Sequence, residues 1–222
     1  MLAPVLSLLV PPRCAACGAP STVGRWLCHA CQAALPWLGP ELCPACALPL
    51  PCGPPCPARR SAFAAAWAPV ALEGPARALV HALKFGGRTA VADVMAAQML
   101  ANVPRGLLGP EACLVPAPAH PARRRERGFD QAMVLARRLG RRVRLPVVAA
   151  LARSGAARRQ TGAGRRERLL GVEVRATRPV AGSVVLIDDV HTTGATLQAC
   201  ALALRAAGAT SVVALTYART LP

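Results

Sequence analysis

The clearest hydrophobic run in the chain is short and is followed at once by polar residues. The run VVLI at 184–187 is mostly β-branched, which predicts a parallel strand buried on both faces. From Leu197 to Ala207 the apolar residues follow a helical pattern, and Gly208 stands where a left-handed residue would close that helix. A strand, a tight loop and a helix in this order indicate an α/β domain with a mainly parallel sheet.

Earlier segments predict further elements of the same domain. Trp67–Leu72 predicts a strand, and Pro75–Leu83 predicts a helix that brings Lys84 to its end. The residues Arg123–Arg127 form a charged loop in this interpretation, and Asp130 caps or pairs locally as the chain enters an amphipathic helix. The candidate core residues of that helix are Phe129, Met133, Val134 and Leu135.

The N-terminal stretch MLAPVLSLLVPP is apolar but too short to cross a membrane, and no apolar run reaches about 18 residues anywhere in the chain. We interpret this stretch as a packing segment, with a signal peptide as the alternative. No membrane span is expected.

Eight of the ten cysteines fall in pairs within one segment, which is typical of metal binding. Two CxxC knuckles supply four thiolates for a tetrahedral zinc ion, and the second group, CPAC followed by CGPPC, predicts another site. Disulfides are the main alternative for both groups. Four thiolates leave no open coordination position, so both zinc ions would be structural. The two sets of ligands are Cys14, Cys17, Cys28 and Cys31, and Cys43, Cys46, Cys52 and Cys56; the isolated Cys113 and Cys200 are predicted core thiols.

The charge balance points to an anionic partner. The formal net charge is +17, and the stretch from Arg123 to Arg168 carries 15 arginines against three acids. A phosphorylated metabolite, a nucleic acid or an anionic surface would each fit this excess. A solvated basic surface is the structural alternative.

The segment after the predicted strand has the features of a sugar-phosphate site. A Thr/Gly loop that opens a helix can surround a phosphate with backbone N–H groups, and Gly194 permits close approach. The adjacent carboxylates of Asp188 and Asp189 would repel a phosphate, but they can accept hydrogen bonds from the vicinal hydroxyls of a ribose. The carboxyl end of a parallel strand is where open α/β sheets place their ligands.

The stretch VVLIDDVHTTGAT resembles the signature for 5-phosphoribosyl 1-pyrophosphate (PRPP) of type I phosphoribosyltransferases. The rest of the chain resembles the ComF family (ComFC and GntX-like proteins), through the Cys-rich N-terminus, LVHALKFGGR at 79–88, VPAPAHPARRRERGFDQA at 115–132 and a basic loop around Gln160. The resemblance implies a type I phosphoribosyltransferase fold at 61–222 behind a double zinc-binding module at 1–60. It also implies a connection with DNA uptake during natural competence.

The resemblance assigns roles to individual residues. Asp188 and Asp189 would bind the ribose hydroxyls as the catalytic pair. The loop residues Val190, His191, Thr192, Thr193, Gly194, Ala195 and Thr196 would hold the 5′-phosphate. Lys84, Ala117 and Arg127 would lie near pyrophosphate, and Gln160 and Arg168 would belong to a mobile hood. This chain departs from the hood pattern at Ala157, Ala163 and Gly171.

Several functional interpretations remain open from the sequence. Mg²⁺ would accompany PRPP, and an acceptor nitrogen would attack C1′ as pyrophosphate leaves, but no feature identifies the acceptor. A non-catalytic PRPP-binding regulator is one alternative. A zinc-containing protein that handles single-stranded DNA, with DNA-uptake proteins as partners, is another, although aromatic residues make up only 3% of the chain. Thiolate zinc and a cytosolic metabolite favour the cytoplasm, and the oligomeric state is not predicted.

Overall fold

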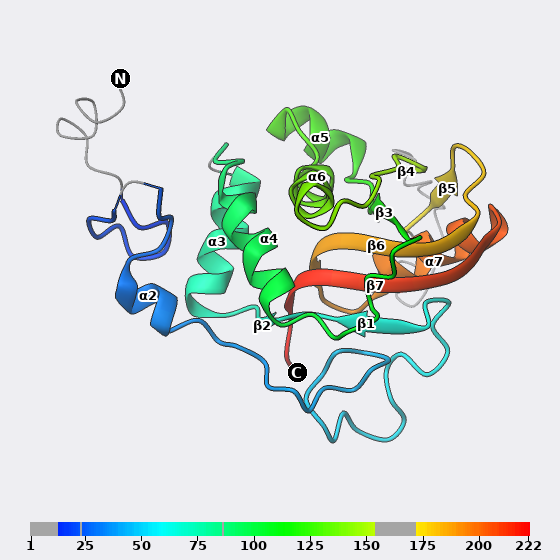
Figure 1. The fold of residues 1–222 in the computed structure, drawn as a ribbon, viewed down its shortest axis with the longest axis horizontal. Helices are drawn as coiled ribbons and strands as arrows, with labels where there is room; N and C mark the ends of the chain where they lie inside the picture. Colours follow the sequence, from blue (N-terminus) through cyan, green and yellow to red (C-terminus); the bar gives the residue numbers. More distant parts are fainter. Residues whose placement is uncertain (1–12, 23, 86, 154–171) are drawn as a thin grey trace, which may run out of the picture.

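The structure, a computed structural model, describes residues 13–22, 24–85, 87–153 and 172–222 (Figure 1). Its centre is a five-stranded sheet in the order β1-β7-β6-β3, with β2 also paired to β7, and every pairing in it is parallel. The strands are β1 (Ala65–Trp67), β2 (Val70–Ala71), β3 (Cys113–Pro116), β6 (Gly182–His191) and β7 (Ala209–Arg219). A separate antiparallel pair joins β4 (Leu151–Arg153) to β5 (Val174–Ala176).

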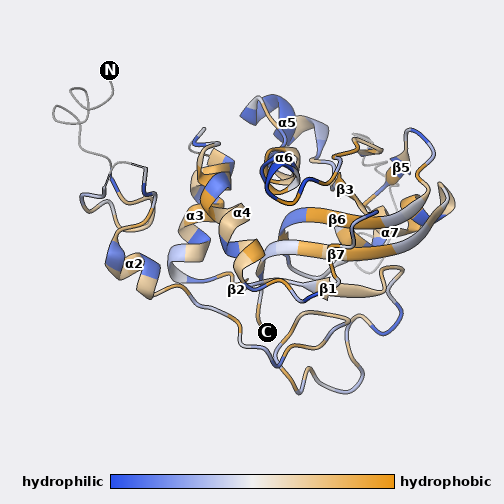
Figure 2. Ribbon diagram, viewed as in Figure 1, coloured by the Kyte–Doolittle hydropathy of each residue, from blue (hydrophilic) through white to orange (hydrophobic). Residues whose placement is uncertain are grey.

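Helices cover both faces of the sheet because successive residues of the central strand point to opposite sides. In β6, Val185 and Ile187 enter one core, and Val184 and Leu186 enter the other. The first core is covered by α3 (Gly74–Phe85), α4 (Val91–Ala101) and α6 (Gln131–Val143), and the second by α7 (Ala195–Ala206). Hydrophobic residues lie along β6 and β7 (Figure 2). The predicted mainly parallel sheet flanked by helices, with its strand buried on both faces, is confirmed.

The central strand β6 is longer than its hydrophobic run. It continues through the two acids to His191 because β7 runs beside it over the same length, with Asp188 opposite Thr216 and His191 opposite Arg219. Asp188 and Asp189 are therefore residues of the strand itself and do not follow it. The helix α7 begins at Ala195, two residues before the predicted start, and Gly208 has the expected left-handed conformation at φ 106°.

Two local predictions need correction. The predicted strand 67–72 is divided into β1 and β2 by Ala68 and Pro69, and proline cannot donate to a ladder. The charged loop predicted at Arg123–Arg127 is instead the helix α5 (Pro121–Arg127). His120 caps it by accepting a hydrogen bond from the N–H of Ala122, and proline occupies the first turn, where its missing N–H costs nothing.

Asp130 caps α6 as expected and also ties it to the loop after β3. Its Oδ1 accepts from the N–H of Met133 at 3.2 Å, and its Oδ2 accepts from the N–H of Ala119 at 2.9 Å. Of the four predicted core residues of this helix, Leu135 is fully buried, whereas Phe129, Met133 and Val134 are only partly buried. Beside Leu135, the buried face of the helix is made by Ala132, Ala136, Leu139 and Gly140.

The Cys-rich segment packs against both faces of the sheet. Cys14, Leu27, Leu35 and Leu42 belong to the core under α3, α4 and α6, whereas Cys43, Cys46 and Leu48 belong to the core under α7. In Figure 1 the segment carries α2 (His29–Ala33) on one side of the molecule and then continues below the sheet. Within the described residues, no helix is long and apolar enough to cross a membrane.

Candidate functional site

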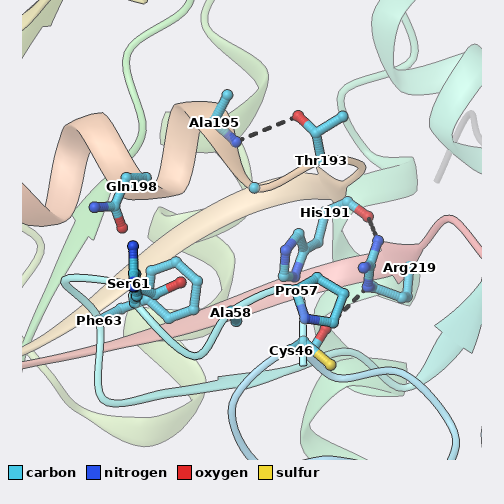
Figure 3. Close-up of a pocket in the computed structure, with 12 residues that line it drawn as sticks. Cys46, Pro57, Ala58, Ser61, Phe63, His191, Thr193, Ala195, Gln198 and Arg219 are labelled. Atoms are coloured by element: carbon cyan, nitrogen blue, oxygen red, sulfur yellow. Dashed lines mark hydrogen bonds between the residues drawn. The ribbon is translucent and has the colours of Figure 1, made fainter. Parts of the chain in front are cut away.

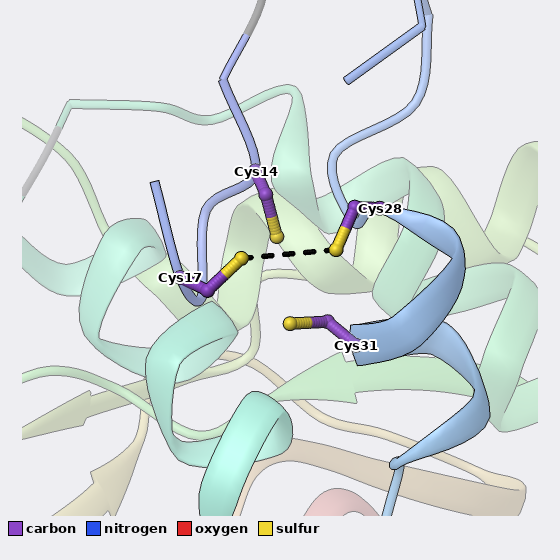
Figure 4. Close-up of side chains that lie close together, drawn as sticks. All are labelled: Cys14, Cys17, Cys28 and Cys31. Carbon is purple, nitrogen blue, oxygen red and sulfur yellow. Dashed lines mark hydrogen bonds between the residues drawn. The ribbon is translucent and has the colours of Figure 1, made fainter. Parts of the chain in front are cut away.

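The first cysteine cluster has the geometry of a zinc centre. The sulfur atoms of Cys14, Cys17, Cys28 and Cys31 all lie within 4.8 Å of one another, and they surround a common point (Figure 4). The Sγ atoms of Cys17 and Cys28 are 3.7 Å apart. A tetrahedral zinc with Zn–S bonds of about 2.3 Å separates its sulfurs by about 3.8 Å, whereas a disulfide needs about 2.05 Å. The cluster fits zinc, and all ten cysteines are free thiols.

The second cluster repeats this geometry with Cys43, Cys46, Cys52 and Cys56, whose sulfurs also lie within 4.8 Å. The Sγ atoms of Cys43 and Cys56 are 3.7 Å apart. Burial raises the pKa of Cys43, but backbone N–H groups of Cys46 and Ala45 outweigh it and lower the pKa to about 7, whereas burial raises the pKa of Cys46 to about 12, so the support for zinc comes from the positions of the sulfurs. A thiolate is the form that binds metal. Both predicted structural zinc sites are therefore supported.

The two acids at the end of β6 have different surroundings. Asp189 is 4% exposed and forms an ion pair with Nζ of Lys84, which comes from the last turn of α3. Asp188 is partly buried, and its Oδ1 accepts a hydrogen bond from the N–H of Asp189 at 2.8 Å. Burial, and then the charge of Asp189, raise the pKa of Asp188 well above its usual range. Lys84 therefore compensates one carboxylate and leaves the other available.

The loop after the acids opens toward solvent at the start of α7. Thr192 and Thr193 are exposed, and Gly194 turns the chain with φ 82° before the helix begins at Ala195. The Oγ1 of Thr193 accepts from the N–H of Ala195 at 3.4 Å. Because the first N–H groups of a helix have no partner inside it, this turn can receive an anion.

A cavity of about 360 Å³ lies between this turn and the second cysteine segment (Figure 3). Phe63 and His191 form one wall, with ring centroids 6.2 Å apart and the rings edge to face. His191 is 3% exposed, and burial, followed by the charge of Arg219, lowers its pKa to about 4. The imidazole is therefore neutral at physiological pH. Apart from the position of His191 next to the predicted strand, no sequence pattern indicates this burial.

Arg219 is the functional candidate that the sequence analysis missed. Its guanidinium is buried and donates hydrogen bonds to the backbone oxygens of Cys46, His191 and Thr192 (Figure 3 draws two of its partners). The available signal was a single arginine at the end of the apolar stretch VVALTYAR.

The remaining predicted residues lie in several places. Ala117 is buried, and its N–H donates to the carbonyl of Ile187 at 2.8 Å, so it lies beside the acids. Arg127 stacks over the ring of Phe85 at 5.0 Å and donates from Nη1 to Oε1 of Gln131 at 3.1 Å. Gln160 and Arg168 fall outside the described residues. Cys200 is buried as predicted, whereas Cys113 is only partly buried.

Comparison with known proteins adds the wider context. Residues 5–59 match the double zinc ribbon domain. A solved structure of the allosteric regulatory enzyme of purine biosynthesis is 22% identical with a TM-score of 0.39, over 56% of this chain and 25% of that enzyme chain.

Relatives of similar length align with nearly the whole chain. The DNA utilization protein YhgH of Escherichia coli (strain K12) is 33% identical over 96% of this chain and 100% of its own length. The proteins of the same name from Shigella flexneri and Salmonella typhimurium (strain LT2) are each 32% identical over the same shares. With this identity across nearly its full length, the chain belongs to the family of the DNA utilization protein YhgH.

Proposed function

We propose that this protein binds PRPP at the end of β6, with Asp188 and Asp189 on the ribose hydroxyls and the loop from Val190 to Thr196 on the 5′-phosphate. The observation that carries the proposal is the closeness of two unlike features. A carboxylate pair, one member of which is compensated by Lys84, is followed within four residues by an open turn at a helix N-terminus. A sugar phosphate needs hydroxyl acceptors and an anion cradle at this separation.

The pyrophosphate end of PRPP requires positive charge nearby. Lys84 lies at the site through its ion pair, and Arg127 lies over the ring of Phe85, the neighbour of Lys84. Ala117 begins the turn beside the acids. In this proposal Gln160 and Arg168 complete the binding of pyrophosphate as part of the hood. The boundary that we propose between the zinc-binding module, 1–60, and the phosphoribosyltransferase-like domain, 61–222, lies just before Phe63 and β1.

Magnesium suits the oxygen donors of this site, because Asp188 offers a carboxylate that no described cation pairs directly. When bound with PRPP, Mg²⁺ would neutralise charge on the pyrophosphate. Transfer to an acceptor would then rest on positioning and electrostatic stabilisation, since bond making to C1′ accompanies loss of pyrophosphate and no protein nucleophile is required. A PRPP-binding regulator without turnover would use the same residues for binding alone.

The test is calorimetric titration of the zinc-loaded protein with PRPP and Mg²⁺. The wild type should bind, and Asp188→Asn/Asp189→Asn should not, while circular dichroism shows that the variant remains folded. Asp93→Asn is the matched control, because Asp93 pairs with Arg138 away from the loop. Equal binding by the wild type and the double variant, or none by a folded wild type, would exclude this site. Where binding is found, pyrophosphate release with candidate acceptors separates a transferase from a regulator.

Handling of single-stranded DNA is a second candidate, in keeping with the name of the relatives and with a role in natural competence. The favouring observation is a groove of about 580 Å³ beside α6, whose lining includes Arg124, Arg137 and Arg153. Among the described residues that line it, Asp130 is the only acidic one, and both carboxylate oxygens of Asp130 already accept backbone hydrogen bonds. DNA affinity that falls steeply with salt and weakens in Arg137→Gln would support this role, which we place in the cytoplasm with DNA-uptake proteins as partners.

A further inference from the structure

The guanidinium of Arg219 connects the second zinc centre to the loop at the start of α7. Its Nε donates to the carbonyl oxygen of Cys46, a zinc ligand, at 2.9 Å. Its Nη1 donates to the carbonyl oxygens of His191 at 2.8 Å and of Thr192 at 2.5 Å. The side chain is 5% exposed, so water cannot easily replace these bonds. One planar group therefore fixes a metal-binding knuckle and two peptide units of the loop together.

This arrangement determines where the loop N–H groups point. A trans peptide is planar, with its C=O and N–H directed to opposite sides. Because Arg219 holds the carbonyls of His191 and Thr192, the N–H groups of Thr192 and Thr193 are turned away from it. These two N–H groups lie in the segment that we assigned to the 5′-phosphate.

The charge around Arg219 is also unusual for a buried arginine. Among the described residues, the carboxylate ion pairs are those of Lys84 with Asp189 and Arg138 with Asp93, so no described carboxylate pairs directly with this guanidinium. Four thiolates around one Zn²⁺ retain negative charge, so an intact second centre favours the buried guanidinium.

We propose that Arg219 is a positioning residue through which zinc occupancy of the second centre, Cys43–Cys56, controls the geometry of the loop at 192–195 and hence its affinity for PRPP. The ligand in this statement rests on the proposed function, whereas the coupling of zinc to loop geometry does not. The first centre packs into the opposite core and contributes no partner to Arg219 among the described residues. The two zinc ions therefore have unequal effects on the loop.

The first experiment removes the bonds and keeps the volume. In Arg219→Met, two zinc ions should remain bound, the hydrogen-bonded amides that flank the loop within 190–198, such as Gln198 N–H on the carbonyl of Gly194, should exchange hydrogen faster, and PRPP affinity should fall roughly tenfold or more, as expected for loss of hydrogen bonds from a charged donor. Arg205→Met is the matched control, since Arg205 is an exposed arginine that bonds the carbonyl of Thr210. Arg219→Lys keeps the charge but cannot reproduce three fixed directions, so it should resemble Arg219→Met. Full retention of loop protection by Arg219→Lys would overturn the positioning role.

The second experiment tests the connection to zinc. Cys52→Ser should release the second zinc ion and speed hydrogen exchange at the hydrogen-bonded amides within 190–198, but it should add little further effect in the Arg219→Met background. Cys17→Ser should release the first ion and leave exchange at the hydrogen-bonded amides within 190–198 unchanged. Additive effects of Cys52→Ser and Arg219→Met, or equal effects of the two cysteine variants, would overturn the coupling. If the wild type does not bind PRPP, the proposed function fails, but the hydrogen-exchange comparison still decides this inference.

Discussion

The buried imidazole of His191 makes the stability of the protein sensitive to mild acid. The pKa of His191 falls from 6.5 to about 4 in the folded protein, because the ring is buried and Arg219 is near. Between pH 6.5 and 4, the histidine binds a proton in the unfolded chain but stays neutral in the folded protein, so the free energy of unfolding decreases as the pH falls toward 4. At about 1.4 kcal/mol per pKa unit, linkage gives a loss of about 2 kcal/mol at pH 5 relative to pH 7.5 and an upper limit of about 3.4 kcal/mol below pH 4.

Urea unfolding of the wild type and of His191→Leu at pH 7.5 and 5.0 measures this term. Leucine cannot titrate and suits the apolar contact with Phe63, so the variant should gain about 2 kcal/mol relative to the wild type between the two pH values. Zinc binding also weakens in acid, because thiolates must be deprotonated to bind metal, but that loss affects both proteins and cancels in the difference. A wild type and a variant that lose equal stability would show that His191 is accessible to protons in the folded state, contrary to its burial.

Three further predictions concern the site and the zinc centres. Lys84→Met should lower the free energy of unfolding by about 2 kcal/mol at pH 7, because it leaves buried Asp189 unpaired, and Asp189→Asn should restore much of the loss in a chemical denaturation cycle. Gly194→Ala should cost about 1–2 kcal/mol in thermal unfolding, since φ is +82° and a Cβ would lie 3.0 Å from Nε2 of His191. Gly182→Ala, at φ +77° with open space around it, is the control and should cost less. Metal analysis should find two zinc ions per wild-type chain, and strong chelators should unfold both cores; retention of full stability without zinc would contradict this.

The sequence predicts the parts of this molecule in which local pattern and function agree. The run at 184–187 predicts a strand buried on both faces, and the spacing of the cysteine pairs predicts two zinc centres. Both could be predicted because each pattern lies within a short stretch of chain. The length of β6 was not predictable from its own composition. That length is set by β7, because β6 stays paired with β7 as far as His191 opposite Arg219. Both aspartates of β6 are therefore part of the strand.

The contacts that complete the site join segments far apart in the sequence. Lys84 reaches Asp189 across 105 positions, and Arg219 reaches Cys46 across 173. Hydrophobic periodicity carries no information about such partners, so Lys84 was proposed near a phosphate without its pairing to Asp189, and Arg219 was missed. The packing of the Cys-rich segment into two different cores was missed for the same reason, because the cysteine spacing does not indicate which core each cluster joins.

The position of β7 has a consequence for how the chain comes to be folded in a cell. This strand lies inside the sheet between β1 and β6, yet it follows every other described element in chain order. Synthesis proceeds from the N-terminus, so the cysteine knuckles can capture metal early, while the apolar strand β6 stays without one neighbour until the end. A ribosome that stalls before residue 209 would release a metal-bound but unfinished chain with β6 open along one side. Such a chain is a natural substrate for chaperones, and its amount should rise when translation is interrupted late.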